Sequence, residues 1–244
     1  MEYEALLDLV KKRRSIRRFK PDPIPDEAVE KIIEVARWAP SGFNMQPWEF
    51  VVVKKPELRK KIVEYINEYW LQGKTMETAR ESWQGSPWEL KGVTDLGMDY
   101  TTAPVYILLF GDTRTQDGLP MGVRYSPDRL NTIFHAGLGS AFLYMHLAAT
   151  TLGLASQWVS AVTTPYAHCM IKNLLGIPNA LIPYDMMALG YPAGKPGGKF
   201  LRDLEKTVHY DDCGTEDFRT DEEVRDFVKR ARNWTMGAHR KKSD

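Results

Sequence analysis

The residues from Ala103 to Phe110, APVYILLF, form an unbroken apolar run that ends at Gly111. A run of this length, bounded by a glycine, predicts a β-strand buried in a core. A second segment, residues 126–152, begins with Ser-Pro and has a middle, GLGSAFLYMHLAAT, whose residues are apolar or small all round. This pattern predicts a long helix that is buried on every side. The two segments together require a substantial core.

The composition is that of a globular protein with enough chain to form such a core. Of 244 residues, 43% are hydrophobic and 27% are charged, and the formal net charge is +1, so we expect one domain with elaborations. The near balance of charge argues against a general nucleic-acid or membrane-surface binder. No apolar run approaches the ~20 residues of a membrane span. The start, MEYEALLDLVKKRR, has acids where a signal peptide has bases, so we expect a cytoplasmic location.

Hydrophobic spacing predicts the remaining regular elements. The expected helices are residues 3–13, a helix from Asp26 that Pro40 stops, residues 56–70, a short helix from Pro165 closed by Gly176, and a C-terminal helix whose Thr220 and Glu223 match a capping box. The expected strands, besides 103–110, are residues 49–54, 155–162 and 185–191. Residues 71–100 show no clean period and predict an irregular excursion or lid. A C-terminal extension follows residue 213.

Several common motifs of catalysis and metal binding are absent from the sequence. Gly137-Leu138-Gly139 lacks the third glycine of a dinucleotide fingerprint, and neither GxxxxGK[ST] nor GxSxG occurs. His135 and His146 lie about 16 Å apart along their helix, too far to share a metal, so packing or pocket roles are expected for them. Cys169 and Cys213 are far apart, without a CxxC, so neither a disulfide framework nor a zinc site is indicated.

The segment KRRSIRRF, residues 12–19, gathers five basic residues in eight positions. One interpretation, which spacing alone favours, is that these bases complement the macrodipole of the preceding helix and cover a solvent face. The other is that Arg13, Ser15 and Arg17 project to one side and bind a phosphate through charge-assisted hydrogen bonds.

The loop APSGFNMQPW, residues 39–48, also has two interpretations. It could be a tight connection between a helix and a strand. Alternatively, Asn44 and Gln46 offer both donors and acceptors, which suits the edge of a heterocycle.

Four blocks of the sequence, in the same order, resemble the nitroreductase superfamily of flavin enzymes. They are RRSIRRF, PSGFNMQPWEFVVV, HAGLGSAFLYMHLAATTLGLASQWVS and ALGYPAGKPGGKFLRDLEKTVHYD. The resemblance covers most of the chain except residues 71–100 and the end beyond Cys213. It implies an α+β sandwich with a central, mostly antiparallel sheet, bound FMN, and a homodimer with the flavins at its interface.

The resemblance also implies a set of FMN-binding residues. Arg13, Arg14, Ser15 and Arg17 match the phosphate- and flavin-contacting block, and Pro40, Ser41, Asn44 and Gln46 match the loop at the flavin edge. Trp158, Val159 and Ser160 match the segment behind the ring, and Arg202, with Lys199 as a helper, matches the late bases that return to the phosphate. A reduced flavin carries negative charge at N1 and C2=O, which a cation such as Arg17 would stabilise.

Two features depart from the commonest family pattern. Many members have an acid and a glycine where this chain has Ser160 and Ala161. The stretches PELRKKIVEYINEYW, VTTP and LLGIP are similar to the flavin dehalogenase branch, which removes halogen from halotyrosines. That branch binds the amino-acid zwitterion with a Glu, a Tyr and a Lys; Glu68, Tyr69 and Lys74 match these in type, with a different spacing.

The resemblance therefore implies an oxidoreductase in which NAD(P)H reduces FMN and an electron-poor aromatic, such as a nitroarene or quinone, accepts the electrons in a second half-reaction. No side chain is expected to be catalytic, because the chemistry takes place at flavin N5. Trp70, Trp83, Trp88 and Tyr125 could stack on the substrate or pack an irregular segment. The alternatives are reductive dehalogenation, a flavin-dependent oxidation, flavin binding without turnover, and a small-ligand or RNA-phosphate binder. No residue decides between NADH and NADPH.

Overall fold

A computed structural model of the chain describes residues 2–78, 100–194, 196, 198–214 and 218–235. The chain divides into two compact units, one formed by Met1–Gly73 and Gly97–Pro196 and the other by Lys74–Leu96 and Gly197–Asp244. The single domain expected from the sequence stays a prediction. The expected lid at residues 71–100 and the expected C-terminal extension after residue 213 both contribute residues to the second unit. Among the described residues, no helix is long and apolar enough to cross a membrane.

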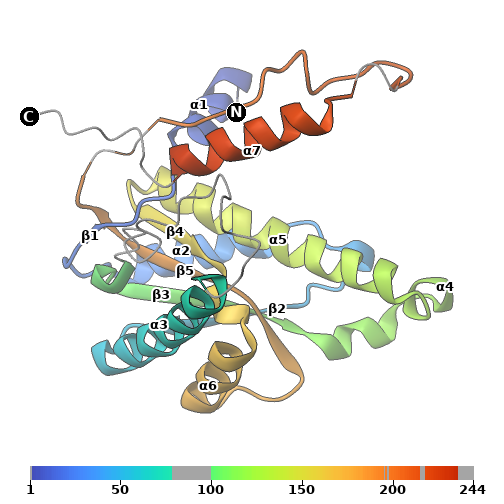
Figure 1. Cartoon of the computed structure of the whole chain (residues 1–244). Helices are drawn as coiled ribbons and strands as arrows, with labels where there is room; N and C mark the ends of the chain where they lie inside the picture. The colour runs from blue at the N-terminus through green and yellow to red at the C-terminus, as the bar shows by residue number, and fades with distance from the viewer. Residues whose placement is uncertain (1, 79–99, 195, 197, 215–217, 236–244) are drawn as a thin grey trace, which may run out of the picture. The chain divides into compact units, whose positions relative to one another are not determined.

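The first unit is built on an antiparallel sheet (Figure 1). Its strands are β1 (Phe19–Lys20), β2 (Trp48–Val53), β3 (Val105–Asp112), β4 (Ala155–Val159) and β5 (Leu181–Pro192). Strand β3 pairs with β2 on one side and with β5 on the other, while β4 and β1 pair with successive parts of the free side of β5. One extra residue on β5, Tyr184, interrupts the β3–β5 register, because Phe110 is opposite Pro183 and Leu109 is opposite Asp185. The expected α+β fold is confirmed.

Helices cover both faces of this sheet. The first unit contains α1 (Tyr3–Lys12), α2 (Asp26–Arg37), α4 (Met121–Arg124), α5 (Pro127–Thr151), α6 (Pro165–Leu175) and most of α3 (Pro56–Thr78). Side chains of β3 alternate between two hydrophobic clusters: Val105, Ile107 and Leu109 pack with α2 and α5, while Tyr106, Leu108 and Phe110 pack with α3 and α6. The apolar run is therefore a strand buried on both faces, as predicted.

Most expected helix ends are confirmed. Pro127 and Pro165 occupy first turns of α5 and α6, and Gly176 ends α6 in the left-handed region, with φ 65°. In the second unit, α7 (Asp221–Thr235) begins with the expected capping box, because the Thr220 N–H donates to Glu223 Oε2 at 2.8 Å and the Glu223 N–H donates to Thr220 Oγ1 at 3.3 Å.

Four expectations need correction. Helix α3 continues to Thr78, into the segment expected to be irregular, because Gly73 weakens a helix without stopping it. Residues 79–99, with Trp83 and Trp88, lie outside the described residues.

Strand β4 ends at Val159 instead of residue 162. The hydroxyls of Thr163 and Thr164 bond to carbonyls of the 3-10 turn Ser160–Thr163, and this turn ends the strand. Helix α5 is not buried all round, because Leu143 is 44% exposed. Finally, β1 was not expected.

Gly111 leaves no room for a side chain between β3 and α5. A Cβ built there would lie 2.5 Å from the Phe134 ring and 2.7 Å from Leu138 Cδ1, and both of those side chains are fully buried. We expect Gly111→Ala to lower the free energy of unfolding by about 1–3 kcal/mol through overpacking, as measured by urea denaturation. The control is Gly118→Ala, because a Cβ at Gly118 meets nothing within 4 Å. Equal stability of the two variants would contradict this packing.

Candidate functional site

The basic N-terminal segment leaves helix α1 and runs beside strand β4. Arg13 caps α1 through its backbone N–H, which donates to the carbonyl of Leu9. Ser15 then forms an isolated parallel bridge with Ser156, and the Ile16 N–H donates to the Ser156 carbonyl at 3.0 Å. These backbone contacts hold residues 13–17 beside the start of β4, which lies far away in the sequence.

Arg13 and Arg14 form a pair of cations without a carboxylate. Among the described residues, the Arg14 guanidinium donates to the backbone carbonyls of Lys11 and Arg13. In the part of the chain that the structure describes, no acid lies within ion-pair distance of either arginine. Arg13 is half-buried, and burial together with the charge of Arg14 lowers its pKa. Two adjacent cations that repel each other suit a phosphate dianion.

The position of the bases separates the two interpretations of this segment. Lys11 and Lys12 lie in the last turn of α1 and are exposed, so the macrodipole accounts for them. Arg13 lies beyond the helix end and is half-buried at the sheet edge, where desolvation is unfavourable for a cation. A bound anion would offset that cost.

A buried histidine lies behind the segment. His146, on α5, is 1% exposed, and its Nδ1 is 2.7 Å from Ser156 Oγ. Burial, followed by the nearby charge of Arg13, lowers the pKa of His146 to about 3, so the ring is neutral at physiological pH. Its Nε2 is buried and has no hydrogen-bond partner among the residues that the structure describes. The sequence placed His146 in a packing or pocket role but gave no sign of the bond to Ser156.

Trp158 is held on three sides. Its indole stacks on His146, with ring centroids 5.4 Å apart and planes 5° apart, and meets the Phe142 ring edge-on at 4.5 Å. Its Nε1–H donates to Asp185 Oδ2 at 2.5 Å. The Ser160 side chain also favours the charged form of Asp185. Sequence reasoning missed Asp185, although an acid inside an otherwise apolar strand was a possible signal.

The loop between α2 and β2 contains a cluster of unusual backbone conformations. Phe43, Asn44 and Gln46 have φ values of 54°, 52° and 44°, a region that residues with side chains rarely adopt. The Gln46 N–H donates to Ser41 Oγ at 3.0 Å, and Gln46 Nε2 donates to Asn44 Oδ1 at 3.1 Å. Asn44 can still donate and Gln46 can still accept, so the loop retains groups for a heterocycle edge.

Helix α5 supports both the loop and the basic segment. A Cβ on Gly137 would lie 3.1 Å from Ser41 Cβ, and one on Gly42 would overlap Ile133, so glycines allow the loop to approach the helix. Gly137 and His146 are nine residues apart on α5, or about 14 Å. A ligand that reached both groups in one protomer would be elongated, with an anionic end at Arg13 and a hydrogen-bonding ring near Asn44. The donor set fits FMN.

The remaining predicted residues lie elsewhere in the structure. Lys199 and Arg202 belong to the second unit, where Arg202 Nη2 donates to the Lys206 carbonyl at 2.6 Å. Glu68 and Tyr69 are neighbours on α3, and Lys74 lies about one and a half turns further along that helix. Tyr125, at the end of α4, is 75% exposed. The roles of these residues stay predictions. The described residues contain no group of acids, histidines and cysteines that could hold a metal ion.

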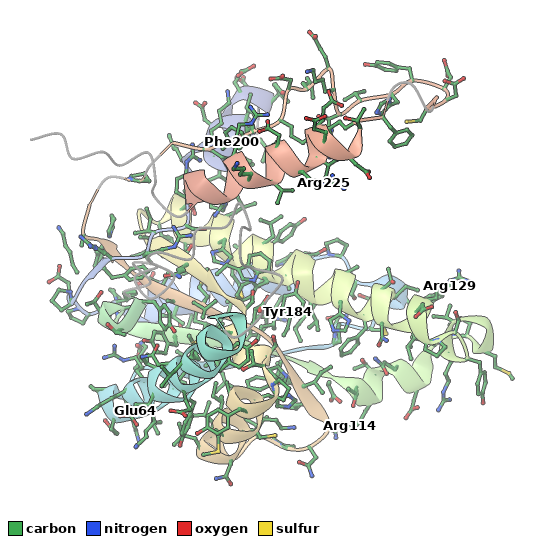
Figure 2. All side chains as sticks on the ribbon, viewed as in Figure 1. Glu64, Arg114, Arg129, Tyr184, Phe200 and Arg225 are labelled. Carbon is green, nitrogen blue, oxygen red and sulfur yellow. The ribbon has the colours of Figure 1, made fainter. Side chains whose placement is uncertain are left out.

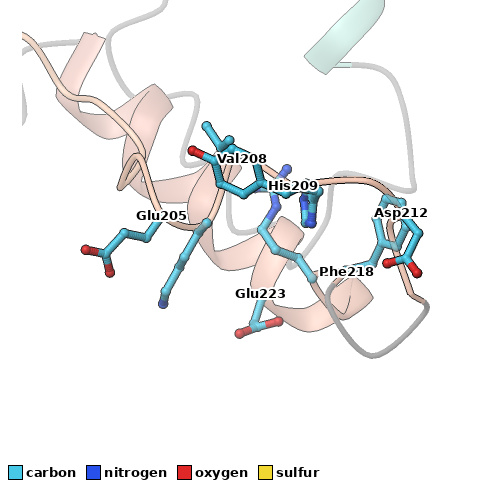
Figure 3. Close-up of a pocket in the computed structure, with 9 residues that line it drawn as sticks. Glu205, Val208, His209, Asp212, Phe218 and Glu223 are labelled. Atoms are coloured by element: carbon cyan, nitrogen blue, oxygen red, sulfur yellow. The ribbon is translucent and has the colours of Figure 1, made fainter.

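The second unit contains a hollow of its own, with a volume of about 510 Å³ (Figure 3). Its walls carry the acids Glu205, Asp212 and Glu223 together with the bases Lys206 and Arg219. None of the residues predicted to bind FMN lines it. We therefore assign the candidate site to the first unit.

Comparison with known proteins agrees with this fold. Residues 10–191 match the model of the protein family described as "Nitroreductase family", and the chain belongs to this family. It is therefore an oxidoreductase of the nitroreductase fold, as the four sequence blocks predicted.

Individual relatives come from two branches of the family. A protein of Methanothermobacter thermautotrophicus, provisionally named NADH dehydrogenase/NAD(P)H nitroreductase, is 27% identical over 82% of this chain and 84% of its own. Iodotyrosine deiodinase 1 of Mus musculus is 37% identical to this chain. The matched region covers 79% of this chain and 64% of the mouse protein. Among solved structures, a BluB-like flavoprotein of Clostridium difficile is 28% identical with a TM-score of 0.67, covering 86% of this chain and 99% of its own.

The neutral, buried His146 makes stability depend on pH. In the unfolded chain an imidazole binds a proton below its ordinary pKa of about 6.5, whereas folded His146 does so only near pH 3. Between these values the unfolded state binds more protons, so the contribution of His146 to stability falls as the pH falls.

We expect the difference in unfolding free energy between the natural chain and His146→Gln to fall by about 1.4 kcal/mol per pH unit from pH 6 to pH 4. Glutamine can still bond Ser156 but does not titrate. Urea denaturation at several pH values measures this difference. Parallel stability curves would show that the ring is protonated within the folded protein.

Proposed function

We propose that the protein is an FMN-dependent oxidoreductase that takes electrons from NAD(P)H and delivers them to a small electron-poor aromatic such as a nitroarene or quinone. The observation that carries the proposal is the half-buried Arg13 next to Arg14 at the edge of β4, where no carboxylate of the described residues pairs with either arginine. Membership of the nitroreductase family and the name of the archaeal relative support both cofactors.

FMN, when bound, would supply the chemistry of accepting and passing on hydride at its N5 atom. The residues of the chain would bind and orient it. Arg13, Arg14 and Ser15 would hold the phosphate, while Arg17 would lie at the pyrimidine edge and stabilise negative charge there. The strand end Trp158–Ser160 would lie behind the ring, and Pro40, Ser41, Asn44 and Gln46 would bond its edge. Lys199 and Arg202 would return to the phosphate.

A homodimer with FMN at its interface is part of the proposal. Helix α1 has no buried residue, and its apolar side chains Tyr3, Leu6 and Val10 are 72%, 48% and 42% exposed. Leu143 on α5 is exposed as well. A second copy of the chain would cover these residues, and its loop could complete the site of the first.

Reductive dehalogenation is the second candidate function, and the 37% identity to mouse iodotyrosine deiodinase favours it. In that case the acceptor is a halotyrosine. Glu68, Tyr69 and Lys74, on one stretch of α3, would bind its amino and carboxylate groups.

The visible absorption spectrum tests both functions. The purified protein, supplied with FMN, is expected to show an oxidised-flavin spectrum that NADH or NADPH bleaches in the absence of oxygen, and that a nitroarene or quinone restores. Recovery with 3-iodotyrosine and release of iodide, without recovery by nitroarenes, would assign the protein to dehalogenation. Bound flavin that neither nucleotide reduces would indicate a flavin-binding protein without turnover. Failure to take up FMN would reject the proposal.

A double variant tests the phosphate site. Arg13→Ala with Arg17→Ala should weaken FMN binding about 100-fold or more, because each lost charge-assisted hydrogen bond contributes about 1.5–3 kcal/mol. Fluorescence titration with FMN measures the change, and circular dichroism checks the fold. The matched control, Lys11→Ala with Lys12→Ala, removes the same charge from exposed positions of the last turn of α1. Equal weakening by both pairs would mean that only the general field of the bases attracts FMN.

A further inference from the structure

A buried carboxylate joins the end of β4 to β5. Asp185 is 7% exposed and lies opposite Leu109 in the middle of the sheet. Its Oδ2 accepts the Trp158 indole N–H at 2.5 Å, and the Ser160 side chain also favours its charged form. No cation lies within ion-pair distance of Asp185 among the described residues. A buried acid with only neutral partners is costly, so its place in this strand needs a reason.

The geometry of the two strands brings Asp185 close to Trp158. Val159 and Met186 are the last pair of the β4–β5 ladder, so Asp185 and Ser160 are the next residues of the two segments just beyond it. Trp158 pairs with Met187 and is diagonal to Asp185 on the same face of the sheet, because side chains of a strand alternate. Tyr184, labelled in Figure 2, is the extra residue of the bulge just before Asp185. Bulges of this kind redirect neighbouring side chains.

The partners of Asp185 are otherwise restrained by packing. The Trp158 ring is fixed against His146 and Phe142, and Ser160 begins the turn that follows β4. Asp185 therefore bonds to the end of β4, next to the point where the strand becomes a turn. This is the segment that, in the proposed function, lies behind the flavin ring.

We propose that Asp185 is a positioning residue for the flavin site: its carboxylate clamps Trp158 and Ser160 and places a negative charge behind the flavin ring. The effect on the flavin, which is the flavin half of the inference, rests on the proposed function. The clamp, which is the contact that Asp185 makes within the chain, does not. This role differs from the roles assigned to Arg13–Arg17, whose positive charges would bind the anionic groups of the cofactor.

The charge of the clamp depends on pH. Burial raises the pKa of Asp185 to about 6, and the Trp158 indole N–H and the Ser160 side chain oppose that rise. The titratable groups packed around it are Tyr184 on β5 and, on α5, His146 behind Trp158 and His135 beside Tyr184. The charge of Asp185 raises the pKa of Tyr184 further, after burial, and burial keeps His146 neutral. The carboxylate is therefore charged at pH 8 and protonated at pH 5.

The first experiment uses the full chain without flavin. In ¹H–¹⁵N spectra, the indole N–H resonance that Trp158→Phe removes is expected to shift with pH, with a midpoint near 6. Asp185→Asn should abolish the shift. Ser160→Ala, at an exposed position, should move the midpoint upward because it removes a side chain that favours the charged form. His135→Gln, which changes the exposed imidazole beside Tyr184, is the control and should leave the midpoint unchanged.

The second experiment measures the flavin midpoint potential of the FMN-loaded protein. Removing a negative charge favours the reduced flavin, so Asp185→Asn should have the more positive potential at pH 8, and the difference should disappear at pH 5. An indole resonance that titrates unchanged in Asp185→Asn, or equal potentials at pH 8, would overturn the inference while leaving FMN binding intact. A natural chain that takes up no FMN would overturn the proposed function and the flavin half of the inference, and the indole titration would still decide the clamp.

Discussion

Strand β3 is apolar on both of its faces, and the arrangement of the first unit depends on covering them. Its side chains alternate between a cluster with α2 and α5 and a cluster with α3 and α6. The neighbouring strand β5 follows the same alternation, with Met187 and Leu189 on one side and Met186 and Ala188 on the other. Because burial of apolar area is the main force that stabilises such layers, α5 is fixed against the sheet over much of its length.

Helix α5 then becomes the surface on which the candidate site is assembled. Gly137 allows the loop around Ser41 to approach the helix, and His146, about 14 Å further along, supports Ser156 and Trp158. The basic segment reaches the same region through the bridge between Ser15 and Ser156. Chain segments that are far apart in the sequence thus place cations at one end of the site and carboxamides at the other, and this division suits a cofactor with a phosphate and a ring.

The polar groups buried beneath the site follow a common rule. His146 bonds to Ser156, and Asp185 accepts the indole N–H of Trp158, so each group offsets part of its desolvation cost. Their pKa values shift in opposite directions, downward for the histidine and upward for the acid, because burial disfavours the charged form of both. The network joins the basic segment to the end of β4 through packing and hydrogen bonds within one cluster.

The sequence alone determined the local elements and the family. Pro165 and Gly176 bound α6, the capping box starts α7, and the run before Gly111 forms β3, because each depends on neighbours within a few residues. The four blocks likewise named the candidate FMN residues. Only the tertiary structure decided the exposed side of α5, the end of β4 at Val159, the positive φ values near Asn44, and the pairing of Trp158 with Asp185. These features arise where segments distant in the chain meet, and no local periodicity encodes such contacts.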